Sequence, residues 1–506
     1  MSHDPVVQTA YGPVIGRECD GLYRFLGIPY ASTPTGDLRW QPTGPPKAWV
    51  QQRSCHNFGK ACPQPLSSFG PNINAADTSE DCLFLNIWTP SCRMGEKLPV
   101  MVWIHGGAFY LGAGSQSIYN GSPLAHRGAV VVTINYRLGP FGFLASPLLA
   151  AESPHHSSGN YGLLDQVEAL RWIQENVEGF GGDPQRVTIF GESAGAFSAC
   201  RLMASPLASG LFHRVIAQSG GPVGDWVPVR PGRYTALEHA YEVWDRISVR
   251  LGCMRGRESL KAMRSRSAEQ ILATTHSGLQ LFRNVSMLGP VVDGWVLPEN
   301  PASRFARGVQ EPVPLLIGIN LDEGTLFREF APVNSPLRYR VLLRLVAGNR
   351  AAELLGLYPA RNREEVFQSL DRLITLLEFM APARFAADSM RKLGVPAFLY
   401  QFSHCPPTEE GRRWAVHHGA EIPYVFGGVD RTLGYGESDQ ELSRTMMDYW
   451  LAFAESGNPN GSGRLTWPSY DGHGSYLEFG DPIRAGQGLW QQECDLADQL
   501  FPPKVV

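Results

Sequence analysis

Short apolar runs alternate with helix-period patterns along most of the chain. Runs of strand length lie at 98–104, 129–134, 187–190, 215–217, 313–319 and 398–402. Between them, apolar residues at positions 163, 167, 170, 173 and 177 recur at helical spacing and predict an amphipathic helix. Alternation of this kind predicts an α/β fold, in which helices cover a large, mostly parallel sheet.

Two segments depart from this alternation. Residues 6–7, 14–15 and 22–26 are short β-prone runs separated by Gly and Asp, and they predict short antiparallel strands. The segment 325–392 is rich in Leu, Arg and Ala and shows no strand pattern. Because no Gly/Ser-rich linker divides the chain, residues 1–506 are expected to form a single domain with a helical cap at 325–392.

Asp183-Pro184 marks a turn before the strand at 187–190.

Composition excludes several classes of protein. The chain has 506 residues, of which 43% are hydrophobic and 18% charged, as in globular proteins. A net charge of -4 gives no electrostatic reason to bind nucleic acid or an anionic membrane. No apolar run is long enough to span a bilayer. The N-terminus lacks a signal peptide pattern, so a cytoplasmic location is expected, although a processed secreted form would look the same. None of the nine cysteines forms a CxxC pair, so no zinc or thioredoxin-type site is predicted.

The most informative motif is Gly191-Glu192-Ser193-Ala194-Gly195. It follows the strand at 187–190 and precedes a helix expected at 196–203. In a GxSxG motif between strand and helix, the serine lies on a turn too tight for side chains two positions away on either side. The motif therefore predicts a nucleophile elbow that carries Ser193, in preference to a structural turn.

A serine nucleophile needs a base, which in turn is oriented by an acid. In this chain order the acid and the histidine follow the serine. Asp322 and Glu323 come directly after the strand at 313–319, and either carboxylate fits. His417 and His418 lie beside a glycine and an acidic residue, and the residue pattern alone does not choose between them.

A glycine-rich loop follows the strand at 98–104. Its sequence, His105-Gly106-Gly107-Ala108-Phe109, matches loops whose backbone amides form half of an oxyanion hole. Small residues let the backbone approach a substrate carbonyl oxygen. With an elbow downstream, this interpretation is favoured over a plain glycine turn.

With these motifs in order, the chain resembles the type-B carboxylesterase family, the carboxylesterase and cholinesterase branch of the α/β hydrolases. The resemblance extends over nearly the whole chain. Further matching motifs are FLGIPYA at 25–31, SEDCLFLNI at 79–87, NYRLG at 135–139, GNYGLLDQ at 159–166, FGGDP at 180–184 and GNPN at 457–460. It implies the α/β-hydrolase fold.

The resemblance also implies roles for individual residues. Ser193 corresponds to the nucleophile, and Glu323 to the acid of an Asp-Glu-Gly triplet. His418, which precedes Gly-x-Glu, corresponds to the base, so His417 is a bystander. The implied reaction is hydrolysis of small to medium apolar or aryl carboxylic esters through an acyl-enzyme, with no metal or cofactor.

The implied oxyanion donors are the amides of Gly107, Ala108 and Ala194. Many relatives have glycine at the Ala108 position, so the alanine methyl group is expected to narrow the acyl side. The residues expected to line the substrate pocket are Phe109, Tyr110, Leu326 and Phe327. The family often has a disulfide at the positions of Cys62 and Cys82, and the sequence leaves open whether this bond forms here.

Two alternatives to an ester hydrolase remain open at this point. The same triad supports amide, carbamate or lactone hydrolysis. A non-catalytic binding protein on this scaffold is disfavoured because Ser193, Glu323 and His418 are all present. The expected partner is a small ester, and the sequence does not predict the oligomeric state.

Overall fold

The structure is a computed structural model that describes residues 4–65, 73–223, 236–253, 257–275, 288–328 and 333–502. The chain divides into two compact units. The first unit comprises residues Met1–Arg214 and Gly232–Asn300. The second unit comprises residues Val215–Pro231 and Pro301–Val506.

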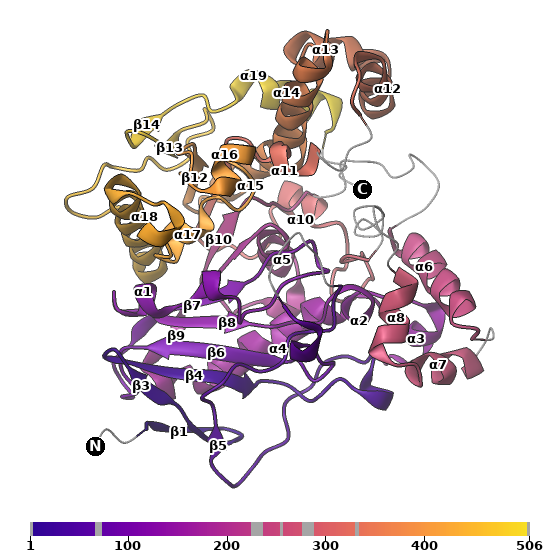
Figure 1. Ribbon diagram of the computed structural model, residues 1–506, viewed down its shortest axis with the longest axis vertical. Helices are drawn as coiled ribbons and strands as arrows, with labels where there is room; N and C mark the ends of the chain where they lie inside the picture. Colours follow the sequence, from indigo (N-terminus) through magenta and orange to yellow (C-terminus); the bar gives the residue numbers. More distant parts are fainter. Residues whose placement is uncertain are drawn as a thin grey trace. The chain divides into compact units, whose positions relative to one another are not determined.

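The first unit is built on a mixed sheet with the strand order β9-β7-β8-β6-β4-β3 (Figure 1). Its strands are β3 (Arg17–Cys19), β4 (Leu22–Pro29), β6 (Phe84–Thr89), β7 (Leu98–Ile104), β8 (Val130–Ile134) and β9 (Gly182–Glu192). β7 runs parallel to both β8 and β9, while β6, β4 and β3 pair antiparallel. All residues of β8 are buried, as expected of a central strand covered on both faces.

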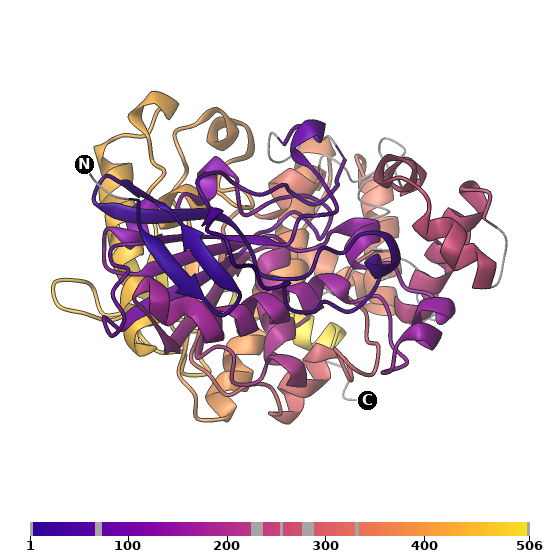
Figure 2. The ribbon, with the colours of Figure 1, turned by 90° about the horizontal axis from the view of Figure 1, so that it is seen from below.

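A small second sheet lies at the N-terminus of this unit, drawn in indigo in Figure 2. It contains β1 (Val6–Thr9), β2 (Gly12–Ile15) and β5 (Arg53–Ser54). β1 and β2 pair antiparallel, as predicted for these N-terminal runs.

Two helices of the first unit position the elbow. α4 (Tyr161–Asn176) is buried on almost every side, so the predicted amphipathic helix is a core helix that meets solvent mainly at Arg171 and Glu175. α5 (Ala194–Met203) follows β9 and packs against β9 and β7. The turn predicted at Asp183-Pro184 is wrong, because both residues belong to β9. The pairing of β9 with β7 is irregular there, and the Asp183 side chain accepts the Gln185 N–H at 2.9 Å.

Six more α-helices lie in the described part of this unit. They are α1 (Ser122–Ala125), α2 (Gly139–Gly142), α3 (Pro147–Glu152), α6 (Ala236–Arg250), α7 (Arg257–Arg264) and α8 (Ala268–Thr275).

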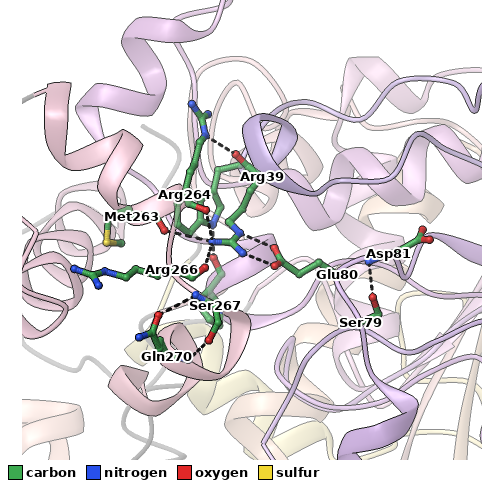
Figure 3. A network of polar contacts seen from close by, with 11 residues as sticks. Arg39, Ser79, Glu80, Asp81, Met263, Arg264, Arg266, Ser267 and Gln270 are labelled. Carbon is green, nitrogen blue, oxygen red and sulfur yellow. Dashed lines mark hydrogen bonds and ion pairs between the residues drawn. The ribbon is translucent and has the colours of Figure 1, made fainter.

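One arginine from the N-terminal part of the chain holds the end of α7 (Figure 3). The Arg39 guanidinium forms an ion pair with Glu80 and also donates to the carbonyl oxygens of Met263, Arg264 and Arg266. Two of these carbonyls belong to the last turn of α7, where carbonyl oxygens lack the partner four residues later that they have inside a helix. A positive charge at this end of a helix is also favoured by the helix dipole. The end of α7 is therefore fastened to Arg39, which Glu80 holds in place.

The second unit contains parallel strands in the order β10-β11-β12-β13, with β14 antiparallel at the edge. They are β10 (Arg214–Gln218), β11 (Leu315–Asn320), β12 (Ala397–Phe402), β13 (Tyr476–Phe479) and β14 (Arg484–Gly486). β11 and β12 are buried along their whole length. β11 ends three residues before Glu323, and this places the predicted acid just beyond the carboxyl end of a buried strand.

Helices surround these strands. They are α10 (Pro301–Arg307), α11 (Gly324–Arg328), α12 (Pro336–Ala347), α13 (Ala351–Leu357), α14 (Arg363–Ile374), α15 (Ala381–Lys392), α16 (Glu409–Trp414), α17 (Ile422–Val425), α18 (Glu437–Ser456) and α19 (Gln491–Leu500). The described part of 325–392 is helical, with a π-helical turn at Thr375–Met380 that leads into α15. α15 packs against β11 and β12. That the segment acts as a cap remains a prediction, as does the single domain.

Every strand predicted from an apolar run is found, with ends shifted by a few residues. Strands β3, β5, β6, β13 and β14 were not predicted. Within the described ranges, no helix is both long and apolar enough to cross a membrane.

Candidate active site

The turn between β9 and α5 has the strained geometry of a nucleophile elbow. Ser193 has a φ of 54° and a ψ of -122°, a region that non-glycine residues rarely adopt. A Cβ on Gly195 would lie 1.9 Å from the carbonyl oxygen of Ile104, and one on Gly191 would lie 2.6 Å from the same oxygen. Glycine is therefore required at both positions. Strained backbone conformations such as that of Ser193 are often found at functional residues.

The glycine loop after β7 lies against this elbow. A Cβ on Gly106 would come within 2.6 Å of the Glu192 carboxylate and 3.2 Å of the Ser193 Cβ. Gly107 has a φ of 105°, and a Cβ there would collide with the Leu111 carbonyl oxygen at 2.2 Å. The first unit thus brings the predicted nucleophile and the predicted oxyanion loop into contact.

Two consecutive non-glycine residues of this loop have left-handed backbone conformations. The φ angles of Ala108 and Phe109 are 55° and 63°. The Phe109 carbonyl oxygen accepts the Gly139 N–H at 2.7 Å, which ties the turn to α2. Backbone strain at adjacent residues persists only where the surroundings fix it, and such places are often functional.

The far side of the loop is held by buried polar groups. Gln64 donates to the Gly112 carbonyl oxygen at 2.9 Å and accepts the Gly112 N–H at 2.8 Å. The His105 ring is fully buried and stacks on Tyr136 with centroids 4.4 Å apart. Burial lowers the pKa of His105 to about 4, so this ring is neutral at physiological pH. His105 therefore supports the loop as an uncharged group.

The predicted pocket residues of the first unit are both buried. Phe109 is 9% exposed and meets the Phe143 ring edge-on at 5.2 Å. Tyr110 is 1% exposed, and burial raises the pKa of its hydroxyl. Of these two predicted pocket residues, Phe109 is the more exposed.

In the second unit, the predicted acid and base are hydrogen-bonded. His418 Nδ1 lies 2.6 Å from Glu323 Oε2, and both side chains are buried. The other carboxylate oxygen of Glu323 accepts the backbone N–H of Asn320 at 2.7 Å. A carboxylate in this position holds the imidazole with Nε2 directed away from it and stabilises the imidazolium form.

A second buried carboxylate lies behind Glu323. Glu421 accepts hydrogen bonds from the side-chain amides of Asn320 at 2.6 Å and Gln218 at 2.8 Å. The Asn320 amide also donates to the His417 carbonyl oxygen at 2.9 Å. Burial, followed by the charge of Glu323, raises the pKa of Glu421. Asn320 therefore connects the loop that carries Glu323 to the loop that carries His418.

The neighbours of the acid and base have other contacts. Asp322 accepts the Val416 N–H at 3.2 Å and lies 3.5 Å from Arg372. His417 Nδ1 lies 3.1 Å from the Ala415 carbonyl oxygen, and burial lowers the pKa of this ring. Of the two residue pairs left open by the sequence, Glu323 and His418 are the ones that meet each other.

Aromatic rings cover the imidazole of His418. Phe327 and Phe379 each have their ring centroid 5.0 Å from that of His418. Phe327 was predicted as a pocket residue, and it lies beside His418. Leu326 is half-buried in α11. Phe379 was not predicted, because it lies in the π-helical turn at Thr375–Met380, for which the sequence shows no local signal.

Each unit thus carries part of the predicted site. The first holds Ser193, Gly107, Ala108, Ala194, Phe109 and Tyr110, and the second holds Glu323, His418, Leu326 and Phe327. Asn320, Glu421 and Gln64 were not predicted as site residues. Glu421 belongs to the motif that identified His418, so its place in the sequence could have suggested a role.

The cysteine pair implied by the family is present as two thiols. Cys62 and Cys82 are both free and buried, and a hydrogen bond to Cys62, followed by burial, raises the pKa of Cys82. Across the described residues, no group of three or more His, Cys, Asp or Glu side chains could hold a metal ion.

Comparisons with known proteins identify relatives over nearly the whole chain. The family model described as the carboxylesterase family matches residues 3–497. The fumonisin B1 esterase of Sphingopyxis macrogoltabida is 38% identical over 97% of this chain and 89% of its own length. The para-nitrobenzyl esterase of Bacillus subtilis is 37% identical over 93% of each chain.

Solved structures show the same fold. A carboxylesterase from Geobacillus stearothermophilus is similar with a TM-score of 0.84 at 34% identity, covering 97% of this chain and 99% of the other. A PNB esterase gives a TM-score of 0.80 at 34% identity over 97% and 100%. The α/β-hydrolase fold predicted from the sequence is confirmed.

The fold and its relatives define an enzyme of the α/β-hydrolase class that hydrolyses carboxylic esters. More particularly, the chain belongs to the carboxylesterase family.

Proposed function

We propose that this esterase works through an acyl-enzyme on Ser193, with His418 as general base and Glu323 as the acid that orients it. The observation that carries the proposal is the 2.6 Å contact between His418 Nδ1 and Glu323 Oε2. It leaves Nε2 as the nitrogen that can accept a proton from a serine hydroxyl. The strained elbow at Ser193 supports the role of nucleophile.

In the first half-reaction, the Ser193 Oγ attacks the ester carbonyl carbon while His418 takes the hydroxyl proton. The backbone amides of Gly107, Ala108 and Ala194 donate to the oxyanion that forms. One such donor typically contributes about 2.7–4 kcal/mol to the stability of the transition state. His418 then gives its proton to the leaving alcohol, and the acyl group remains on Ser193.

In the second half-reaction, His418 takes a proton from water, and the hydroxide attacks the acyl carbonyl carbon. Collapse of this intermediate releases the carboxylic acid and returns the proton to Ser193 Oγ. Glu323 remains ionised throughout, because its charge stabilises the imidazolium in both steps. General base catalysis of this kind usually contributes about 10²–10⁴ in rate.

The proposed substrates are small to medium esters with apolar or aryl groups. The aromatic rings of Phe109 on the first unit and of Phe327 and Phe379 beside His418 support this range. The name of one relative, para-nitrobenzyl esterase, indicates that this family includes an enzyme that acts on an aryl-containing ester.

The test combines turnover with covalent labelling. Wild-type enzyme should hydrolyse p-nitrophenyl butyrate, and a fluorophosphonate should add one adduct that peptide mass spectrometry places on Ser193. Ser193→Ala should lose at least about 10⁴-fold in kcat with an unchanged melting temperature. A correctly folded Ser193→Ala that retains substantial turnover would refute the proposal.

A matched substrate set separates the alternatives. The p-nitrophenyl ester is compared with the corresponding anilide, a carbamate and a γ-lactone. An ester preference supports the proposal, and higher kcat/KM for one of the other three would assign that class. No turnover and no labelling of Ser193 would favour a non-catalytic protein.

A further inference from the structure

α12 carries apolar side chains on two opposite faces. Its inner face holds Tyr339 and Leu343, which are buried, and the helix packs against α13 and α14 (Figure 1). Its outer face holds Leu337, Val341 and Leu345, which are 72%, 52% and 67% exposed. Polar residues normally occupy the solvent face of a surface helix, so apolar residues on this face need a physical reason.

The three outer residues form one continuous stripe. They follow one another at intervals of four residues, and residues four apart lie above one another on a helix. At 1.5 Å per residue, the stripe extends over about 12 Å. Single exposed apolar residues are normal on a protein surface, whereas a continuous patch usually marks a binding surface. These three residues are called the outer stripe of α12 below.

Arginines flank the outer stripe, and α12 contains no acidic residue. At 3.6 residues per turn, Arg340 and Arg344 lie along one side of the stripe and Arg338 lies along the other. Arg338 donates to Asn334 Oδ1 at 3.3 Å. Arg340 and Arg344 are exposed, and neither side chain has a hydrogen bond or an ion pair with any residue that the structure describes. The outer stripe is therefore bordered by two positive charges that face solvent.

The shape and charge of this face fit the surface of an anionic lipid bilayer. Basic amphipathic helices lie in the headgroup region, where apolar side chains reach the acyl chains and arginines bind lipid phosphates. A lipid surface accepts a single convex helix, whereas a stable protein–protein interface usually buries about 800 Å² on each partner. The short stripe is too small for such an interface. A second copy of this chain would also bring like charges together.

The net charge of -4 does not oppose this contact. At physiological ionic strength, salt limits the reach of a charge to about 8 Å, so the charges on α12 itself decide the attraction. Each arginine near an anionic surface typically strengthens binding by about fivefold. Two arginines and three apolar side chains are therefore expected to give reversible surface binding.

We propose that α12 docks this esterase reversibly on anionic lipid surfaces, with the outer stripe inserted among the acyl chains and with Arg340 and Arg344 at the lipid phosphates. Docking holds the enzyme where apolar esters dissolve. The contact does not use the proposed triad, so it is tested separately from ester hydrolysis.

Binding is measured by co-sedimentation with sucrose-loaded vesicles. One set contains phosphatidylcholine with about 30% phosphatidylglycerol, and the other contains phosphatidylcholine alone. Wild type should bind the anionic vesicles at least about tenfold more tightly than the neutral ones, and added salt should release it. Absence of wild-type binding to the anionic vesicles would overturn the proposal.

A first pair of variants tests the outer stripe. Leu345→Gln removes an apolar side chain that is 67% exposed on α12, and Leu433→Gln removes one that is 62% exposed in the short helix Arg431–Leu433 of the same unit. Leu345→Gln should lower the vesicle partition coefficient by about three- to tenfold, and Leu433→Gln should leave it unchanged. Glutamine at all three stripe positions should lower it by at least about 30-fold. Equal effects of the two single variants would contradict the proposal.

A second pair tests the charges. Arg344→Gln and Arg431→Gln each remove one exposed arginine of the same unit. Arg344→Gln should weaken binding to anionic vesicles by about fivefold and to neutral vesicles by less than about twofold. Arg431→Gln should change neither. A loss of equal size on both kinds of vesicle, or in both variants, would refute the docking of α12 on anionic lipid.

Folding and the other occupants are controlled separately. Because all four substituted side chains are exposed, each single variant should keep the wild-type melting temperature and hydrolyse p-nitrophenyl butyrate at the wild-type rate. Ser193→Ala should bind vesicles like wild type, so failure of the proposed function would not affect this test. Analytical ultracentrifugation detects self-association. A dimer that Leu345→Gln dissociates, without any vesicle binding, would assign the stripe to a second copy and overturn the proposal.

Discussion

The carboxylate of Glu421 accepts a hydrogen bond from the side-chain amide of Asn320 at 2.6 Å, in a region with no exposure to solvent. The backbone N–H of the same asparagine binds Glu323. The proposed acid is therefore positioned by a residue that a second carboxylate holds in place. Buried networks of this kind stabilise one arrangement when every member has its partner, and they are costly when one is removed.

Substitution of Glu421 should slow catalysis, although Glu421 is not part of the proposed triad. Glu421→Ala leaves the Asn320 and Gln218 amides without this acceptor, at about 1–3 kcal/mol for each buried donor. We expect kcat for p-nitrophenyl butyrate to fall by about 10- to 100-fold while KM changes little. Glu421→Gln, which keeps an amide oxygen, should recover part of the loss. Glu441→Ala, on the exposed face of α18, is the control.

The two adjacent histidines should respond very differently to substitution. His418 contacts Glu323, whereas His417 binds a backbone carbonyl oxygen. His418→Ala should reduce kcat by at least about 10³-fold, and His417→Ala by less than about tenfold. Stopped assays with p-nitrophenyl butyrate and melting curves for both variants provide the measurement. A severe loss in His417→Ala together with a mild one in His418→Ala would reverse the assignment.

Ala108 should tolerate glycine and reject valine. Its φ of 55° lies in the left-handed region, where a β-branched residue is strongly disfavoured. Ala108→Val should lower stability by about 1–3 kcal/mol and slow the hydrolysis of esters with bulky acyl groups. Ala108→Gly should keep the stability within about 1 kcal/mol and raise kcat/KM for the bulkiest acyl groups. Urea unfolding and a p-nitrophenyl acyl series, from acetate to pivalate, test both statements.

Asp371 should make stability depend on pH. Burial, followed by the charge of Asp322, raises its pKa from 3.8 to about 7. Since the folded chain binds this proton more tightly than the unfolded chain, the stabilisation is complete below about pH 3.8 and is lost as pH rises toward 7. At pH 8, Asp371→Asn should therefore be more stable than wild type by up to about 4 kcal/mol in the free energy of unfolding. It should also unfold at a higher temperature. The difference should vanish near pH 4.

Calorimetry at the two pH values measures this effect. The control is Asp245→Asn, because Asp245 is exposed on α6. If Asp371→Asn melts below wild type at pH 8, the carboxylate contributes through hydrogen bonds that outweigh the cost of burying its charge.

The sequence predicted the parts of the fold that depend on local sterics. Gly191 and Gly195 are glycines because a Cβ at either position would collide with the Ile104 carbonyl oxygen. This steric requirement is visible in the sequence as the spacing of the two glycines. Apolar runs predicted the buried strands for a similar reason. β6 was missed because its buried Asn86 and Thr89 interrupt the run. Their polarity is satisfied by Thr133 and by the Phe180 carbonyl oxygen, partners distant in the sequence.

The residue pattern alone could not choose between Asp322 and Glu323. That choice required the structure or the resemblance to the family. Asp322 and Glu323 have the same chemistry, and their side chains differ in direction at the end of β11. The support from Glu421 crosses about 100 residues to reach Asn320, so no local pattern encodes it. Phe379 reaches His418 through a π-helical turn, whose register cannot be read from apolar spacing.

The network around Arg39 has a consequence for engineering. One guanidinium contacts both Glu80 and the last two carbonyl oxygens of α7, so the end of this helix depends on a side chain near the N-terminus. A chimera that exchanges α7 and α8 with those of another esterase should therefore carry the residues around positions 39 and 80 from the same parent. Chimeras that keep this pairing should express and melt like the parents. Chimeras that receive the helices alone would lack the matching residues at positions 39 and 80 and should melt at a lower temperature.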